Sequence, residues 1–122
     1  MSSTVLVVDD EVDLLFTIAL SLELAGYRVL KASSGEEAVA VVAAQFPDAI
    51  VLDLRLPGMD GWEVIRRLGE NGCFPRIPVV LLSAQVDAAT AARAVALGVH
   101  AHLVKPFSAT ELTGVLSRLV KA

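Results

Sequence analysis

The stretch "AIVLDLRLPGMDG", residues 49–61, combines an apolar run, a carboxylate and a turn. Residues 49–52 are all apolar, which is typical of a strand covered on both faces, as in a parallel sheet. The run ends on Asp53, and Pro57 and Gly58 then predict a turn before the next element. A carboxylate at the end of a buried strand needs a compensating group, because an isolated buried charge is costly. We therefore take Asp53 as the first candidate functional residue.

The rest of the chain alternates short apolar runs with longer segments of helical length. The apolar runs cover residues 4–8, 28–32, 48–52, 77–82 and 101–104. Between the first two runs, apolar residues recur at spacings of three and four from Leu15 to Leu22, which predicts a helix. Five strands that are each followed by a helix imply right-handed crossovers and helices on both faces of a parallel sheet. We expect a single doubly wound α/β domain over residues 1–122.

Polar residues mark the points where several of these helices begin. Ser34 is followed three residues later by Glu37, and Ser108 is followed in the same way by Glu111. Both pairs have the spacing of a capping box, in which each side chain accepts a hydrogen bond from a backbone amide at the helix start. Asp60 precedes the segment "GWEVI" and is expected to cap that helix rather than to take part in chemistry.

Composition limits the classes of function. The chain has 122 residues, of which 55% are hydrophobic and 20% charged, with a net charge of −4. These values fit one domain with a real core, and they provide no basic surface for direct binding of nucleic acid. No apolar run approaches the ~20 residues needed to span a bilayer, and the N-terminus does not resemble a signal peptide. We expect a cytoplasmic location, a single Cys73 in a packing or loop role, and a loop role for His100.

Polar side chains follow four of the five predicted strands. They are Asp9, Asp10 and Glu11 after the first, Asp53 at the third, Ser83 at the fourth and Lys105 at the fifth. The carboxyl ends of parallel strands share one edge of the sheet, and open α/β sheets bind ligands there. We expect these side chains to meet in one crevice.

Three carboxylates in one crevice repel one another unless positive charge compensates them. Lys105 supplies one positive charge, and a divalent cation would supply the two that remain. Mg²⁺ suits the site because it accepts few protein oxygens, keeps several waters and serves phosphate chemistry. Asp9 and Asp10 are adjacent, so one or both can hold the metal.

A site of this kind is suited to a phosphoryl group. The metal and Lys105 would offset charge on the transferring oxygens, and the Ser83 hydroxyl could donate a hydrogen bond. The sequence has no Gly-x-x-x-x-Gly-Lys loop to hold a nucleotide. The nucleophile is then a carboxylate that forms an aspartyl phosphate, and Asp53 is the candidate because its strand is expected to be central.

Four motifs together resemble a known family. They are "VLVVDDE" (5–11), "VLDLRLPGMDG" (51–61), "LLSA" (81–84) and "HLVKPF" (102–107). In this order and spacing they resemble the receiver domain of bacterial two-component response regulators, over essentially the whole chain. The resemblance implies a flavodoxin-like sheet with strand order 2-1-3-4-5. It also implies a phosphorylation-dependent switch, in which a sensor histidine kinase or a phosphotransfer protein supplies the phosphoryl group from a phosphohistidine to Asp53.

The resemblance assigns further roles around the phosphoacceptor. Asp10, Asp53 and the backbone carbonyl of Arg55 would bind Mg²⁺, with Asp9 helping through water. Lys105 would contact the phosphoryl group, and its bond to Pro106 is expected to be cis.

Ser83 matches the switch serine or threonine of the family, which turns toward the phosphoryl group, and the small Ala84 beside it leaves room for access. The resemblance also implies that Arg55 and Gln85, which flank the site, tune the lifetime of the phosphoryl group.

His102 departs from the family pattern. The family usually has Tyr or Phe three residues before the lysine, where the ring swings inward as the serine moves. An imidazole can pack as a flat ring, but it also gains charge near neutral pH. We therefore hypothesise that activation through His102 depends on pH between ~6 and ~7.5.

The output surface is expected to comprise the helix of residues 87–98, the strand of residues 101–104 and the helix of residues 109–120. The first of these is rich in alanine and has few charges, which is typical of a docking surface. A downstream effector or output domain would bind there, and a homodimer formed on phosphorylation is a further expectation. An alanine-biased genome is the alternative explanation of the same pattern.

Two other functions remain as alternatives. One is a degenerate receiver that acts as a phosphate-independent scaffold. The other is a metal-dependent phosphohydrolase with an aspartyl intermediate, although the known enzymes of the haloacid dehalogenase family carry Asp-x-Asp and this chain carries adjacent acids. We expect a switch that is not an enzyme beyond its own phosphotransfer and dephosphorylation.

Other residues have structural explanations. Trp62 is expected to pack at the start of its helix, and Arg66, Arg67 and Arg93 are expected on solvated helix faces. Glu11 either tunes the metal site or is a favourable carboxylate in the first turn of a helix.

Overall fold

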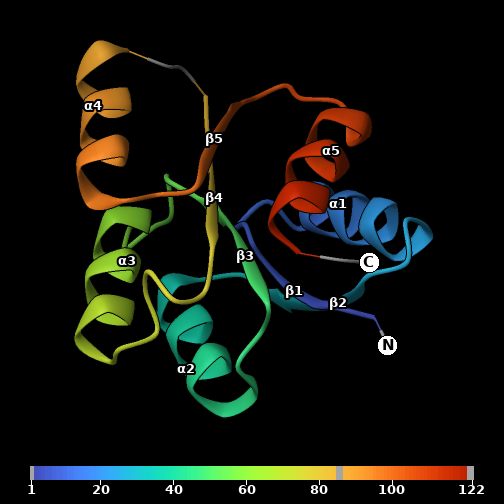
Figure 1. The fold of residues 1–122 in the computed structure, drawn as a ribbon, viewed down its shortest axis with the longest axis horizontal. Helices are drawn as coiled ribbons and strands as arrows, with labels where there is room; N and C mark the ends of the chain where they lie inside the picture. Colours follow the sequence, from blue (N-terminus) through green and yellow to red (C-terminus); the bar gives the residue numbers. More distant parts are fainter. Residues whose placement is uncertain (1, 85–86, 121–122) are drawn as a thin grey trace.

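The protein forms a five-stranded parallel sheet with helices on both faces (Figure 1). A computed structural model describes residues 2–84 and 87–120, so Gln85 lies outside the described residues. The elements are β1 (Thr4–Val8), α1 (Val12–Leu24), β2 (Arg28–Ala32), α2 (Gly35–Gln45), β3 (Ala49–Asp53), α3 (Gly61–Glu70), β4 (Val79–Ser83), α4 (Ala88–Leu97), β5 (Ala101–Val104) and α5 (Ala109–Leu119). The strand order is β2-β1-β3-β4-β5, which confirms the predicted flavodoxin-like sheet.

Two apolar clusters fill the space on either side of the sheet. One lies under α2, α3 and α4 and the other under α1 and α5, the arrangement that Figure 1 shows. We call these sides the α2–α3–α4 face and the α1–α5 face. Every residue of β3 and β4 is buried, because both strands are central and covered on both faces. The two strands begin and end slightly later than the sequence indicates, so Asp53 and Ser83 are the last residues of their strands.

The helix starts agree with the predicted caps, with one difference. Asp60 accepts a hydrogen bond from the amide of Glu63 at 3.0 Å, and Ser108 forms a complete capping box with Glu111. Ser34 accepts from the amide of Glu37, as expected. The Glu37 carboxylate, however, accepts from the amide of Ser33, one residue earlier than a capping box requires. Ser34 and Glu37 therefore both accept hydrogen bonds from backbone amides at this helix start, but Glu37 bonds to the Ser33 amide and not to the Ser34 amide of a capping box.

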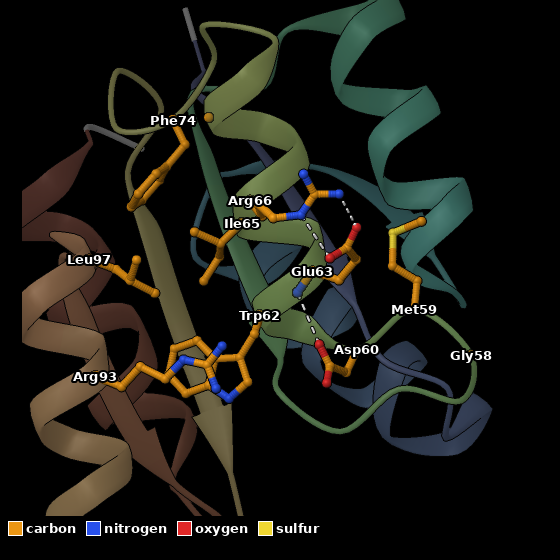
Figure 2. A pocket seen from close by; sticks show the side chains of 11 residues that line it. Gly58, Met59, Asp60, Trp62, Glu63, Ile65, Arg66, Phe74, Arg93 and Leu97 are labelled. Carbon is orange, nitrogen blue, oxygen red and sulfur yellow. Dashed lines mark hydrogen bonds and ion pairs between the residues drawn. The ribbon is translucent and has the colours of Figure 1, made fainter.

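Helix α4 buries little of its surface against the rest of the protein. Ala94 is its one buried residue among those described, and Val95 is 79% exposed. The guanidinium of Arg93 lies 4.4 Å from the ring centre of Trp62 on α3, a cation–π contact that Figure 2 shows. Arg93 is exposed, as expected of a residue on a solvated helix face. The contact with Trp62 is an addition to that expectation, and it forms because α3 brings an aromatic ring alongside α4.

A groove of ≈ 670 Å³ lies between α3 and α4, and Trp62 and Arg93 are among the residues that line it (Figure 2). Ile65, Phe74 and Leu97 give it apolar walls, and Arg66 lines its edge. Arg66 is paired with Glu63 and Glu70 along α3.

No helix in the described part of the chain has both the length and the apolar character needed to cross a membrane.

Candidate functional site

Two acidic side chains and one ammonium group meet at the carboxyl edge of the sheet. Asp9 follows β1, Asp53 ends β3 and Lys105 follows β5. The Nζ atom of Lys105 donates a hydrogen bond to Asp53 Oδ2 at 2.9 Å and another to Asp9 Oδ2 at 3.1 Å. Three segments far apart in the sequence are thus joined at one point, as the positions of the residues at strand ends predict.

The second oxygen of each carboxylate is fixed by the backbone. The amide of Glu11 donates to Asp9 Oδ1 at 3.0 Å, and the amide of Arg55 donates to Asp53 Oδ1 at 3.1 Å. In each carboxylate, one oxygen therefore accepts a hydrogen bond from the backbone amide two residues later in the sequence, and the other accepts one from Lys105. Both side chains are buried, with Asp53 only 4% exposed, so their orientations are set by these contacts rather than by water.

The turn after Asp53 brings α3 back against the end of β3. The amide of Gly61 donates to the carbonyl of Leu54, and a Cβ atom on Gly61 would lie 2.9 Å from the carbonyl oxygen of Asp53. Glycine is required at this position because any side chain would collide with the backbone of the strand end. The turn that the sequence predicts from Pro57 and Gly58 ends at this close approach.

Burial and charge act in opposite directions on the two ionisable partners. Burial raises the pKa of Asp53, helped by the charge of Asp9, while the hydrogen bonds from Lys105 and the Arg55 amide act to lower it. Burial alone would lower the pKa of Lys105, but the hydrogen bonds to Asp53 and Asp9 and their negative charges raise it. Lys105 therefore stays charged near neutral pH, whereas ionised Asp53 is held at a cost in free energy.

The acidic residues fit a divalent cation. Carboxylate oxygens of Asp9, Asp10 and Asp53 lie within 4.8 Å of one another, and Asp10 is exposed to solvent. Against the single charge of Lys105, three carboxylates leave an excess of two negative charges. Hard oxygen ligands with access to water are the set that Mg²⁺ prefers in proteins.

A cavity of ≈ 260 Å³ adjoins these groups, lined by Asp10, Glu11, Asp53, Arg55, Ala84 and Lys105. The phosphoacceptor candidate, a candidate metal ligand and the ammonium group therefore face one space that a small ligand can enter.

Within the described part of the chain, the Ser83 side chain bonds to His102 and not to this cluster. Its Oγ atom lies 2.7 Å from Nε2 of His102, and the two groups share a hydrogen bond. Ser83 follows Leu81 by two residues on β4, and Leu81 packs on the α2–α3–α4 face. Side chains alternate along a strand, so Ser83 lies on that face, whereas Asp53 is paired with Leu82, which packs on the α1–α5 face. The sequence placed all these residues at one edge, but the alternation separates Ser83 from the acids.

Other predicted residues lie where the sequence indicates. The Lys105–Pro106 bond is cis. His100 lies in the loop before β5, where its Nδ1 atom accepts a hydrogen bond from the Val79 amide at 3.3 Å. Cys73 is partly buried against the apolar cluster of the α2–α3–α4 face, in agreement with a packing role.

The hydrogen bond between Ser83 and His102 was missed by the sequence reasoning. It depends on the register between β4 and β5, which pairs His102 with Leu81 and so places His102 on the same face as Ser83, and local sequence patterns do not define that register.

Comparison with known proteins identifies the family. The family model described as "Response regulator receiver domain" matches residues 5–117. The chain is 36% identical over 121 residues to the phosphate regulon transcriptional regulatory protein PhoB of Pseudomonas aeruginosa, a match that covers 99% of this chain and 53% of that protein. It is 36% identical over 117 residues to the transcriptional regulatory protein KdpE of Mycobacterium tuberculosis, covering 96% of this chain and 50% of that protein. The chain thus spans about half the length of these relatives.

Solved structures agree with the sequence relatives. The chemotaxis protein CheY4 of Vibrio cholerae superimposes with a TM-score of 0.92 at 28% identity, covering 98% of this chain and 100% of that one. A response regulator of Chloroflexus aurantiacus superimposes with a TM-score of 0.90 at 33% identity, covering 98% of each chain. The chain belongs to the receiver domain family of the response regulators of two-component signalling systems.

Proposed function

We propose that this receiver accepts a phosphoryl group on Asp53 from a phosphohistidine of a partner kinase or phosphotransfer protein. The observation that carries the proposal is the Asp53 carboxylate, which is buried and held 2.9 Å from the Lys105 ammonium beside two further acids. A structural ion network would satisfy the charges, but it would not need an adjoining cavity. Residues 1–122 would act as one receiver unit in this reaction.

In the transfer, a carboxylate oxygen of Asp53 forms a bond to phosphorus while the bond between phosphorus and the imidazole nitrogen of the donor breaks. The electron pair of that bond stays on the imidazole, which leaves as the neutral base when it carries or takes up a proton. Lys105 would release a carboxylate contact and donate to a phosphoryl oxygen instead. Asp10, Asp53 and the carbonyl of Arg55, with Asp9 through water, would hold Mg²⁺, which offsets negative charge when bound.

The phosphoryl group would shift a pre-existing equilibrium between two arrangements of the protein. It adds charge and acceptor oxygens beside Lys105, and Ser83 would turn to donate to one of them. A coupling of this kind typically amounts to ~1–3 kcal/mol. Hydrolysis of the acyl phosphate would then return the protein to its resting state.

The output would pass through α4, β5 and α5. Val95 on α4 and Val104 on β5 are exposed large apolar residues, so this surface carries unburied apolar area in the resting protein. Apolar patches of this kind mark interaction surfaces. An effector, an output domain or a second phosphorylated copy of this chain would bind there.

Incubation with acetyl phosphate and Mg²⁺ followed by intact mass measurement tests the proposal. We expect the wild-type chain to gain one phosphoryl group and Asp53→Asn to gain none. Asp13→Asn changes an exposed carboxylate on α1 in the same way and should react like wild type. A wild-type chain that gains no mass would favour the scaffold, and turnover of many phosphorylated substrates would favour the phosphohydrolase.

A further inference from the structure

The hydrogen bond between Ser83 and His102 has a consequence for phosphorylation. The two side chains share the α2–α3–α4 face, whereas Asp53, Asp9 and Lys105 gather on the opposite side of their strands. To reach a phosphoryl group on Asp53, the Ser83 hydroxyl has to rotate away from the position it holds here. The contact of 2.7 Å to His102 Nε2 cannot survive that rotation.

The surroundings make the loss of that contact costly. Ser83 is 6% exposed and His102 is half-buried, so water replaces a broken hydrogen bond only in part. The backbone holds both partners in place, because β4 and β5 pair in register from Val80 with Ala101 to Ser83 with Val104. Burial also lowers the pKa of His102, so the ring is predominantly neutral near pH 7, and a neutral ring can accept the serine proton at Nε2.

We propose that His102 is a positioning residue that holds Ser83 away from the phosphoryl site and so opposes phosphorylation. The inference rests on the proposed function. A phenyl ring at this position would pack on the same face without offering a hydrogen-bond partner, so Ser83 would turn more readily. His102 therefore sets how far a phosphoryl group on Asp53 can shift the equilibrium of this chain.

Binding of beryllofluoride, a stable phosphoryl mimic, in the presence of Mg²⁺ tests the inference by calorimetry. His102→Phe should bind about twofold to tenfold more tightly than wild type, the effect of one hydrogen bond removed from the resting state. His100→Phe makes the same change two residues away, in the loop before β5, and should bind like wild type. In a Ser83→Ala background, His102→Phe should have no further effect, because the hydrogen bond is already absent.

Equal or weaker binding by His102→Phe would overturn the inference, as would an equal gain in the Ser83→Ala background. A second measurement needs neither Mg²⁺ nor a phosphoryl mimic. The ¹⁵N resonance of His102 Nε2 should shift on Ser83→Ala, while the resonances of His100 stay unchanged. An unchanged His102 resonance would show that the hydrogen bond is absent in solution and would also overturn the inference.

The outcomes also separate this inference from the proposed function. If wild type and Asp53→Asn both fail to bind beryllofluoride, the phosphoacceptor assignment fails and this inference fails with it. If wild type binds, Asp53→Asn does not, and His102→Phe equals wild type, the phosphoacceptor stands and only the role of His102 is wrong.

Discussion

Replacement of Lys105 by methionine should destabilise the protein strongly, and Mg²⁺ should restore much of the loss. Lys105 contacts Asp53 at 2.9 Å and Asp9 at 3.1 Å. At an effective dielectric constant of about 20, each contact has a Coulomb energy of roughly 5–6 kcal/mol, most of which offsets the desolvation of the charges. Removing one partner of a buried pair typically costs ~3–5 kcal/mol, because the other charge is left uncompensated. The Lys105 side chain is 18% exposed, so we expect about 3 kcal/mol, at the lower end.

Replacing Asp53, the other partner of this ion pair, should have the opposite effect on stability. Asp53→Asn removes a negative charge from an acidic cluster and keeps an oxygen that can accept from Arg55 or Lys105. Because burial raises the pKa of Asp53, its ionised form costs stability, and the asparagine variant should be at least as stable as wild type near pH 7. Lys31→Met is the control, since Lys31 is exposed over the ring of Phe16, and its cost should stay within about 1 kcal/mol.

Urea denaturation followed by far-UV circular dichroism, with and without MgCl₂, measures these free energies of unfolding. Mg²⁺ should stabilise Lys105→Met more than Asp53→Asn, because a ligand that binds the folded state stabilises it according to its affinity. The reasoning is refuted if Lys105→Met is as stable as wild type, or if Asp53→Asn loses as much stability as Lys105→Met.

Three further changes test other parts of the structure. Wild type should lose stability as the pH falls below ~6.5, because burial lowers the pKa of His102 in the folded state and the unfolded chain then binds more protons. His102→Phe should lose less stability than wild type between pH 7.5 and 5.5, as measured by the midpoints of urea denaturation. Equal losses in the two proteins would contradict this prediction. Arg93→Ala should cost about 0.5–1 kcal/mol and change the fluorescence of Trp62, since it removes the cation–π contact between α4 and α3; an unchanged spectrum would argue against that contact. Ser108→Ala should cost ~1 kcal/mol in thermal unfolding through loss of the capping box on α5, while Ser108→Thr should retain most of it.

The sequence predicts those parts of the fold and the candidate site that depend on local patterns. Apolar runs identify the strands, and strand ends place Asp9, Asp53 and Lys105 at one edge, because every strand of a parallel sheet points the same way. Cap positions such as Asp60 follow from side-chain chemistry within one turn of a helix.

The features that the sequence did not yield depend on pairing between distant segments. Trp62 and Arg93 are 31 positions apart, and only the packing of α4 against α3 brings them together. The separation of Ser83 from the acids depends on the register between β3 and β4, which pairs Asp53 with Leu82 and not with Ser83. A shift of one residue in that register would put the two side chains on the same face.

The central claim is that the Asp53 carboxylate becomes phosphorylated because Lys105 and a cation compensate the acids around it. The most direct measurement is to treat the protein with acetyl phosphate and Mg²⁺, reduce any acyl phosphate with borohydride, and locate the reduced residue by peptide mass spectrometry. We predict reduction at Asp53, dependent on Mg²⁺ and diminished in Lys105→Met. Reduction at Asp9 or Asp10 instead, or labelling that does not depend on Mg²⁺, would contradict the account.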